Sequence, residues 1–93
     1  MGQVTVILIF FMVSAEFENA ALEAKNLEST PSNDDLLILY GLYKQATVGD
    51  CNTSKPGMFD LKGKAKWEAW NKLKGTAQSV AETKYIEKVK SLK

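Results

Sequence analysis

The chain has 93 residues, of which 45% are hydrophobic and 25% charged, and its formal net charge is +1. This composition and length are typical of a single globular domain and exclude a disordered segment. Because it has no histidine and only one cysteine, the chain lacks the commonest general base and cannot form an internal disulfide or a zinc site, so we expect no enzyme activity, no catalytic residue, no cofactor and no metal.

Residues 1–13 differ from the rest of the chain. Val4–Val13 is apolar except for Thr5, and it is too short for a membrane-spanning helix, which needs about 20 residues. Its length and the small residues Val13-Ser14-Ala15 resemble a secretory signal, although no lysine or arginine precedes it. Three interpretations stay open: a signal peptide, a buried or membrane-touching appendage, and a variant or artefactual leader without function. We therefore divide the chain into a hydrophobic leader, 1–13, and a domain, 14–93.

From Ser14 onward, apolar residues recur at helical spacing in four segments, which predicts helices over about residues 15–27, 33–48, 63–74 and 77–92. Ser14 and Ser32 are the expected N-caps of the first two helices. Gly49 and Gly75 are expected to end the second and third, with a loop over about residues 50–62 between them. The fold class is all-α, a small four-helix domain. The residues expected to face inward from the first and last helices are Phe17, Ala21, Ala24, Leu27, Ala81, Tyr85, Ile86, Val89 and Leu92.

Charge is unevenly distributed along the chain. The first 39 residues contain one lysine and six acidic residues, whereas the remaining 54 contain eleven lysines and five acidic residues. Every basic residue is lysine, and arginine, the usual reader of guanine, is absent. A basic half built only from lysine favours point-charge contacts with phosphates over sequence readout of nucleic acid.

The second predicted helix carries Leu36, Tyr40, Tyr43 and Lys44 on one face. The tyrosines are either core residues with hydroxyls at the surface, or a platform for a base with a lysine for its phosphates. Lysines 62, 64 and 66 at the start of the next helix oppose its macrodipole and favour an anionic partner. Trp67 and Trp70 are expected in the core rather than on a binding surface. The residues alone thus indicate a ligand that is phosphorylated and aromatic.

Several motifs resemble those of one family. These are YKQATVGD at Tyr43–Asp50, Asn52-Thr53, Pro56-Gly57-Met58, GKAKWEAW at Gly63–Trp70 and LKGT at Leu73–Thr76. Together they resemble the acyl-CoA-binding protein family, also called diazepam-binding inhibitor, over Ser14 to Lys93. The resemblance implies an up-down-down-up four-helix bundle that binds medium- to long-chain fatty acyl-CoA without catalysis and transports or buffers it inside the cell.

The resemblance also implies a role for individual residues. The expected acyl-CoA ligands are Lys25, Tyr40, Gly41, Leu42, Tyr43, Lys44, Lys66 and Tyr85, and the expected acyl-tail contacts are Leu36 and Leu37. Tyr40 and Tyr43 would contact the adenine and its ribose-phosphate region, and Lys44 and Lys66 would pair with the phosphates, notably the 3′-phosphate. Lys25 and Tyr85 would complete the pocket.

Some positions depart from the family pattern. Cys51 replaces a larger apolar residue as a filler in the loop, Ala24 thins the packing of the first helix, and Ser54 creates the glycosylation sequon Asn52-Thr53-Ser54. We expect a cytoplasmic monomer with no nucleic-acid partner and no stable membrane insertion. A secreted, peptide-like signalling protein of the same family remains the alternative, which the leader and the sequon favour. A nucleotide- or nucleic-acid-binding module is a further alternative, which the missing arginine disfavours.

Overall fold

The computed structural model describes residues 14–93, and all regular structure in that range is helical. Its helices are α2 (Ala15–Lys25), α3 (Asn33–Thr47), α4 (Leu61–Asn71) and α5 (Gln78–Ser91). The expected all-α, four-helix architecture is confirmed. The expected leader, 1–13, lies outside the described residues. Within residues 14–93, none of the helices has the length and apolar character needed to cross a bilayer.

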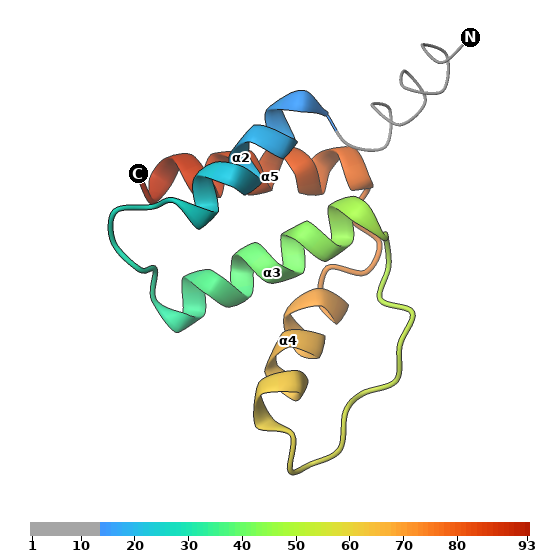
Figure 1. Ribbon diagram of the computed structural model, residues 1–93. Helices are drawn as coiled ribbons and strands as arrows, with labels where there is room; N and C mark the ends of the chain where they lie inside the picture. Colours follow the sequence, from blue (N-terminus) through green and yellow to red (C-terminus); the bar gives the residue numbers. More distant parts are fainter. Residues whose placement is uncertain (1–13) are drawn as a thin grey trace, which may run out of the picture.

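The helix order matches the expected up-down-down-up arrangement (Figure 1). α2 and α5 lie side by side and run in the same direction, while α3 runs the opposite way beneath them. The chain then leaves α3 through a long loop and enters α4, which is steeply inclined to α3. α3 is therefore the central element, with α2 and α5 along one side and α4 on the other.

Three helices begin at side-chain caps. The hydroxyls of Ser14 and Ser32 accept hydrogen bonds of 3.1 Å from the backbone N–H groups of Phe17 and Asp35, as the sequence predicts. The third helix was expected to begin near Gly63, but it begins at Leu61 because the Asp60 carboxylate accepts a 3.0 Å hydrogen bond from the N–H of Gly63. It also ends at Asn71, before the predicted residue 74, and the chain then turns through Gly75 at φ +92°.

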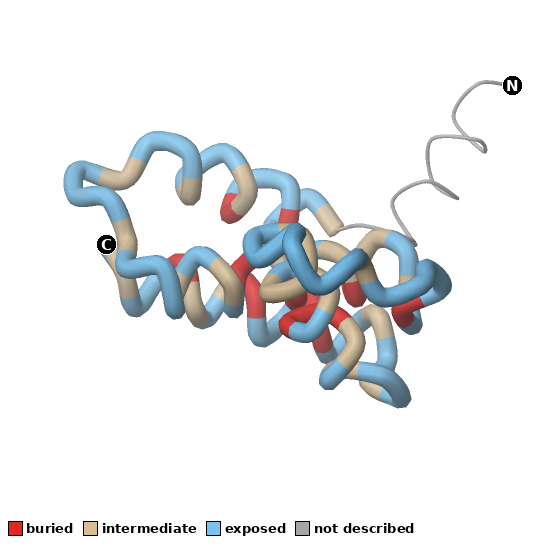
Figure 2. Tube along the Cα trace, turned by 90° about the horizontal axis from the view of Figure 1, so that it is seen from below, coloured by how far each residue is buried: buried red, intermediate tan, exposed pale blue. Residues whose placement is uncertain are grey.

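The core lies where α2, α3 and α5 meet (Figure 2). Burying these apolar side chains is the main driving force available to so short a chain. Partly buried apolar residues pack around this cluster. Four of them were expected to face inward: Ala21, Ala24, Ile86 and Leu92. The buried apolar members are Phe17, Ala20, Leu39, Leu42, Ala46, Ala81, Tyr85 and Val89.

Two tryptophans of α4 hold the loop that precedes this helix. The indole N–H of Trp70 donates to the carbonyl of Gly49, and that of Trp67 donates to the carbonyl of Thr53, both at 2.8 Å. Trp70 is buried, with 4% of its surface exposed, which confirms the expected core position, whereas Trp67 is only half-buried. Cys51 lies in the same loop and is buried as a free thiol, consistent with its expected role as a filler.

The backbones of α3 and α4 approach closely at one point. A Cβ placed on Gly41 would lie 2.5 Å from the carbonyl oxygen of Ala69, so glycine permits the contact as the structure has it. This close contact constrains the angle between the axes of α3 and α4, and with it the size of the cavities between the two helices.

Candidate functional site

Two neighbouring cavities lie along one face of α3. The first, of about 320 Å³, lies between α2 and the C-terminal half of α3 and is lined by Lys25 and Tyr43. The second, of about 430 Å³, lies between the N-terminal half of α3 and α4 and is lined by Tyr40 and Lys66. Tyr40 and Tyr43 are one helical turn apart, so the cavities are adjacent. Both volumes fall within the usual range for ligand pockets of about 300–1,000 Å³.

The cavity beside α4 is the more apolar of the two. Leu36 and Leu37 come from the first turns of α3, and Leu61 and Ala65 from the facing side of α4. The two lysines of this cavity, 62 and 66, project from α4 at its edge. Leu36 is exposed although it is apolar, so its surface is available to a ligand. An apolar chain with an anionic end fits these walls.

The cavity beside α2 is built on aromatic rings. Phe17 stacks on Tyr43 with ring centroids 5.5 Å apart, and Tyr85 lies against both rings, 5.0 Å from Phe17 and 6.0 Å from Tyr43. Burial, and to a lesser extent the neighbouring Tyr43, raises the pKa of Tyr85 above its ordinary value. Tyr85 therefore stays neutral and supports Tyr43 from below, while the ring of Tyr43 is exposed.

Lysine side chains lie over aromatic rings at three places. The ammonium group of Lys66 lies 5.4 Å from the centre of the Tyr40 ring, and that of Lys44 lies 5.3 Å from the Trp70 ring. Such cation–π contacts are attractive by about 0.5–1 kcal/mol at exposed sites, so a phosphate could draw these lysines away from the rings at little cost. The third contact, between Lys55 and Trp67, lies away from both cavities.

The ten expected ligand residues are not all in equivalent places. Lys25, Tyr43, Leu36, Leu37, Tyr40 and Lys66 line one cavity or the other. Gly41 lies at the helix crossing and Leu42 in the core, so neither lines a cavity. Lys44 and Tyr85 do not line one either, although both contact aromatic rings next to them. Direct contact of any of the ten residues with a ligand stays a prediction.

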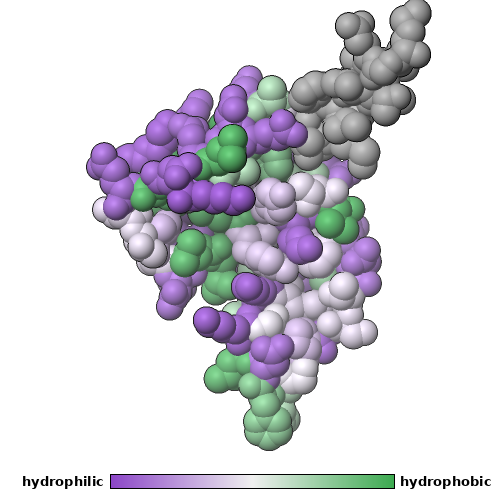
Figure 3. All heavy atoms as spheres, viewed as in Figure 1, coloured by the Kyte–Doolittle hydropathy of each residue, from purple (hydrophilic) through white to green (hydrophobic). Residues whose placement is uncertain are grey.

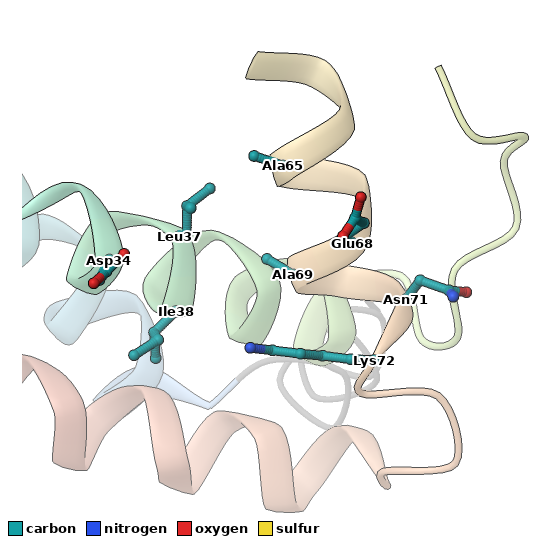
Figure 4. A pocket seen from close by; sticks show the side chains of 8 residues that line it. All are labelled: Asp34, Leu37, Ile38, Ala65, Glu68, Ala69, Asn71 and Lys72. Carbon is teal, nitrogen blue, oxygen red and sulfur yellow. The ribbon is translucent and has the colours of Figure 1, made fainter. Parts of the chain in front are cut away.

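A larger groove lies on the other side of the α3–α4 pair (Figure 4). It has a volume of about 710 Å³, and Leu37 and Ala65 line it as well as the 430 Å³ cavity, so they form the wall between the two. Ala69 also faces it, and Lys72 extends into it alongside α3. The charged residues of this groove are Asp34, Glu68 and Lys72, so it suits a phosphorylated ligand less well than the 430 Å³ cavity, whose charged lining residues are both lysines.

A hydrogen-bond network between the loops was not foreseen from the sequence. The buried side-chain amide of Gln45 donates to the carboxylate of Asp50 at 2.9 Å and to the carbonyl of Thr76 at 2.7 Å. The Asp50 carboxylate also accepts from the N–H of Gly75 at 2.8 Å. These bonds, that of Gly75 first, lower the pKa of Asp50 below its ordinary value. Two residues of the YKQATVGD motif, Gln45 and Asp50, thus join the loops after α3 and α4. A third, Gly49, adopts a positive φ of 99° where the chain leaves α3.

The described residues include no group of three or more His, Cys, Asp or Glu side chains placed to hold a metal ion. The free thiol of Cys51 is buried near Thr53 and lies in neither cavity. The lysine ammonium groups, tyrosine rings and leucines that line the two cavities can hold a ligand by charge, stacking and burial.

Comparison with known proteins agrees with this arrangement. The family described as "Acyl CoA binding protein" matches residues 14–89. The chain belongs to the acyl-CoA-binding protein family. It is 56% identical over 81 residues to the acyl-CoA-binding protein homolog of Drosophila melanogaster, covering 87% of this chain and 94% of that protein. It is 57% identical over 77 residues to the acyl-CoA-binding protein of Gossypium hirsutum, covering 83% and 86%.

Solved structures of the family share the fold. Acyl-CoA-Binding Protein 2 of Oryza sativa superposes with a TM-score of 0.80 at 53% identity, covering 83% of this chain and 84% of that one. The acyl coenzyme A binding protein from yeast superposes with a TM-score of 0.69 at 52% identity, covering 86% and 93%. The resemblance first indicated by the motifs is therefore confirmed along the helical domain.

Proposed function

We propose that the chain binds fatty acyl-CoA thioesters without catalysis, and that it buffers and carries them inside the cell as a monomer. The observation that carries this proposal is the pair of adjacent cavities on α3, one lined by aromatic rings with Lys25 and Glu18, the other apolar with two lysines. A ligand that fills both must join an aromatic, phosphorylated head to an apolar chain, and acyl-CoA has this composition.

The head group is assigned to the tyrosines and lysines. Tyr40 and Tyr43 offer ring surface for the adenine, and base stacking on aromatic rings contributes about 1–3 kcal/mol. Lys25 approaches from α2 and Lys66 from α4, on opposite sides of the tyrosines, so phosphates held between them would have a cation on each side. Lys44, whose ammonium group lies over the ring of Trp70, is next to Tyr43 in the chain, and we assign it as a third cation for the phosphates.

The acyl tail is assigned to the cavity lined by Leu36, Leu37, Leu61 and Ala65. Each buried methylene contributes about 0.8 kcal/mol, so a sixteen-carbon tail contributes on the order of 10 kcal/mol before the costs of ordering it. We therefore assign identity to the head group and most of the affinity to the tail. Such burial would also keep a detergent-like thioester away from water and membranes.

The assignment of Lys66 gives a direct test. Lys66→Ala should weaken palmitoyl-CoA binding roughly tenfold to a hundredfold in titration calorimetry, because a charged hydrogen bond contributes about 1.5–3 kcal/mol. It should hardly change binding of the analogue that lacks the 3′-phosphate. Lys84→Ala, on the exposed surface of α5, is the matched control and should bind both ligands like the wild type. If Lys66→Ala weakens both ligands equally, the assignment to the 3′-phosphate is wrong.

A secreted signalling role is the second candidate, and one observation favours it. Asn52 of the sequon is exposed in the loop before α4, where a glycan would have room. Expression in cultured cells with a C-terminal tag distinguishes the two roles. Tagged protein that stays in the cells at its unmodified mass supports intracellular buffering, whereas tagged protein in the medium that loses mass on glycosidase treatment supports secretion.

A further inference from the structure

The chain carries an exposed apolar tip where the loop before α4 meets the helix. Phe59 has 94% of its surface exposed, Leu61 73% and Met58 71%, which makes them the three most exposed large apolar residues in the described part of the chain. Figure 1 shows the turn that carries them, which leads into α4, at the lower end of the molecule, and Figure 3 shows apolar residues gathered at that end. Exposed apolar residues are ordinary singly, but three within four positions indicate an interaction surface.

Lysines surround this tip. Lys62 and Lys64 follow it in the first turns of α4, Lys66 lies one turn on, and Lys55 precedes it in the loop. The acidic groups nearby are Asp60, whose carboxylate caps α4, and Glu68, which pairs with Lys55 at 3.7 Å. The tip therefore combines a projecting apolar wedge with an excess of positive charge directly behind it.

We propose that this tip docks the protein on anionic membranes, with Phe59, Leu61 and Met58 inserted among the lipid headgroups and the lysines of α4 against the phosphates. Apolar side chains backed by lysines are the pattern of interfacial membrane binding, and lysines near an anionic surface each strengthen it about fivefold. A lipid surface fits a convex tip, whereas a stable protein partner would need about 800 Å² of contact on each side. The docking is peripheral, so it needs no membrane-spanning helix.

The position of the tip suggests what docking would do. Leu61 and Lys62 belong both to the tip region and to the wall of the 430 Å³ cavity. A protein docked by its tip would hold the mouth of this cavity at the headgroup layer, which the tail of a membrane-inserted acyl-CoA must cross as it leaves the bilayer. This consequence rests on the proposed acyl-CoA binding, whereas membrane docking itself does not.

The test measures binding of the full-length, ligand-free chain to vesicles by flotation. Wild type should bind phosphatidylcholine vesicles that contain phosphatidylserine and bind pure phosphatidylcholine only weakly. Phe59→Ser should lower the affinity for the anionic vesicles by about tenfold. Val80→Ser, which removes a 44%-exposed apolar side chain from α5, is the matched control and should bind like the wild type. Residues 1–13 are the same in every variant, so they cannot account for a difference between them.

A second readout locates the tip directly. In Phe59→Trp, the fluorescence added beyond that of Trp67 and Trp70 should be quenched by brominated lipid tails in the vesicles. Absence of this quenching, or equal vesicle binding by Phe59→Ser and wild type, would overturn the proposal. A dimer in size-exclusion chromatography that Phe59→Ser dissociates would assign the tip to self-association and also overturn it. Titration with palmitoyl-CoA in vesicle-free buffer tests the acyl-CoA proposal separately, so failure of one is distinguishable from failure of the other.

Discussion

Trp70 should be the more important of the two tryptophans for stability, because its whole indole is enclosed while Trp67 is half-buried. Trp70→Ala removes a side chain that is 4% exposed, together with the hydrogen bond from its N–H to the carbonyl of Gly49. Truncating a buried aromatic residue costs about 3–5 kcal/mol. A 93-residue chain has a total stability of about 5–14 kcal/mol, so the change removes at least about a fifth of it.

Trp67→Ala is the matched comparison. It also breaks a 2.8 Å hydrogen bond, in this case to the carbonyl of Thr53, but less apolar surface is lost because the ring is partly in water already. We expect a loss of about 1–2 kcal/mol, less than half of that for Trp70→Ala.

Urea unfolding followed by far-ultraviolet circular dichroism measures both losses without relying on tryptophan emission. In thermal unfolding, each kcal/mol lost from the free energy of unfolding lowers the Tm of a domain of this size by about 4–8 °C. Trp70→Ala should therefore lower the Tm by more than about 10 °C. Equal losses for the two variants, or a larger loss for Trp67→Ala, would refute the packing argument.

Two further predictions concern the loops. The N–H of Gly75 and the side-chain amide of Gln45 lower the pKa of Asp50 in the folded state below the ordinary value of 3.8. The negative charge of Asp50 should therefore stabilise the fold above pH 3.8. This contribution should be lost as the pH falls through the folded-state pKa. The stability advantage of wild type over Asp50→Asn, measured by thermal unfolding, should therefore be constant above about pH 5 and shrink as the pH falls from there through the folded-state pKa. A difference that stays constant over this range would show that Asp50 acts without its charge. Gly75→Ala should cost about 1–2 kcal/mol because alanine is strained at φ +92°, whereas Gly57→Ala, where the added methyl group meets open space, should be nearly neutral. Equal stabilities of these two variants in urea unfolding would contradict the strain argument.

The local features of the fold could be read from the sequence because they depend on residues close together in the chain. Ser14 and Ser32 cap helices where predicted, since a serine hydroxyl needs only the N–H three residues later. Gly49 and Gly75 adopt positive φ in the turns that they were expected to form, because glycine has no Cβ to clash with the backbone there. The inward faces were predicted less accurately: Ala20 is fully buried, whereas the expected Ala21 is only partly buried.

The shape of the candidate site could not be read from the sequence, because it depends on how α4 is inclined to α3. That inclination follows from the close contact of Gly41 with Ala69 and from the tryptophan bonds to the loop, which join residues far apart in the chain. The family resemblance named the lysines and tyrosines, but spacing alone left the tyrosines undecided between core and platform. In the structure the tyrosines differ in exposure: Tyr85 is buried in the core, whereas the neighbouring ring of Tyr43 is exposed.

Titration calorimetry of the full-length chain with palmitoyl-CoA, free CoA and palmitate tests the central claim most directly. If both cavities hold one ligand, palmitoyl-CoA should bind with one-to-one stoichiometry and far more tightly than CoA, with palmitate the weakest, because only the thioester has both the head for the lysines and tyrosines and the tail for the leucines. Equal affinities for CoA and palmitoyl-CoA would contradict the account, since the 430 Å³ cavity would then contribute nothing to binding.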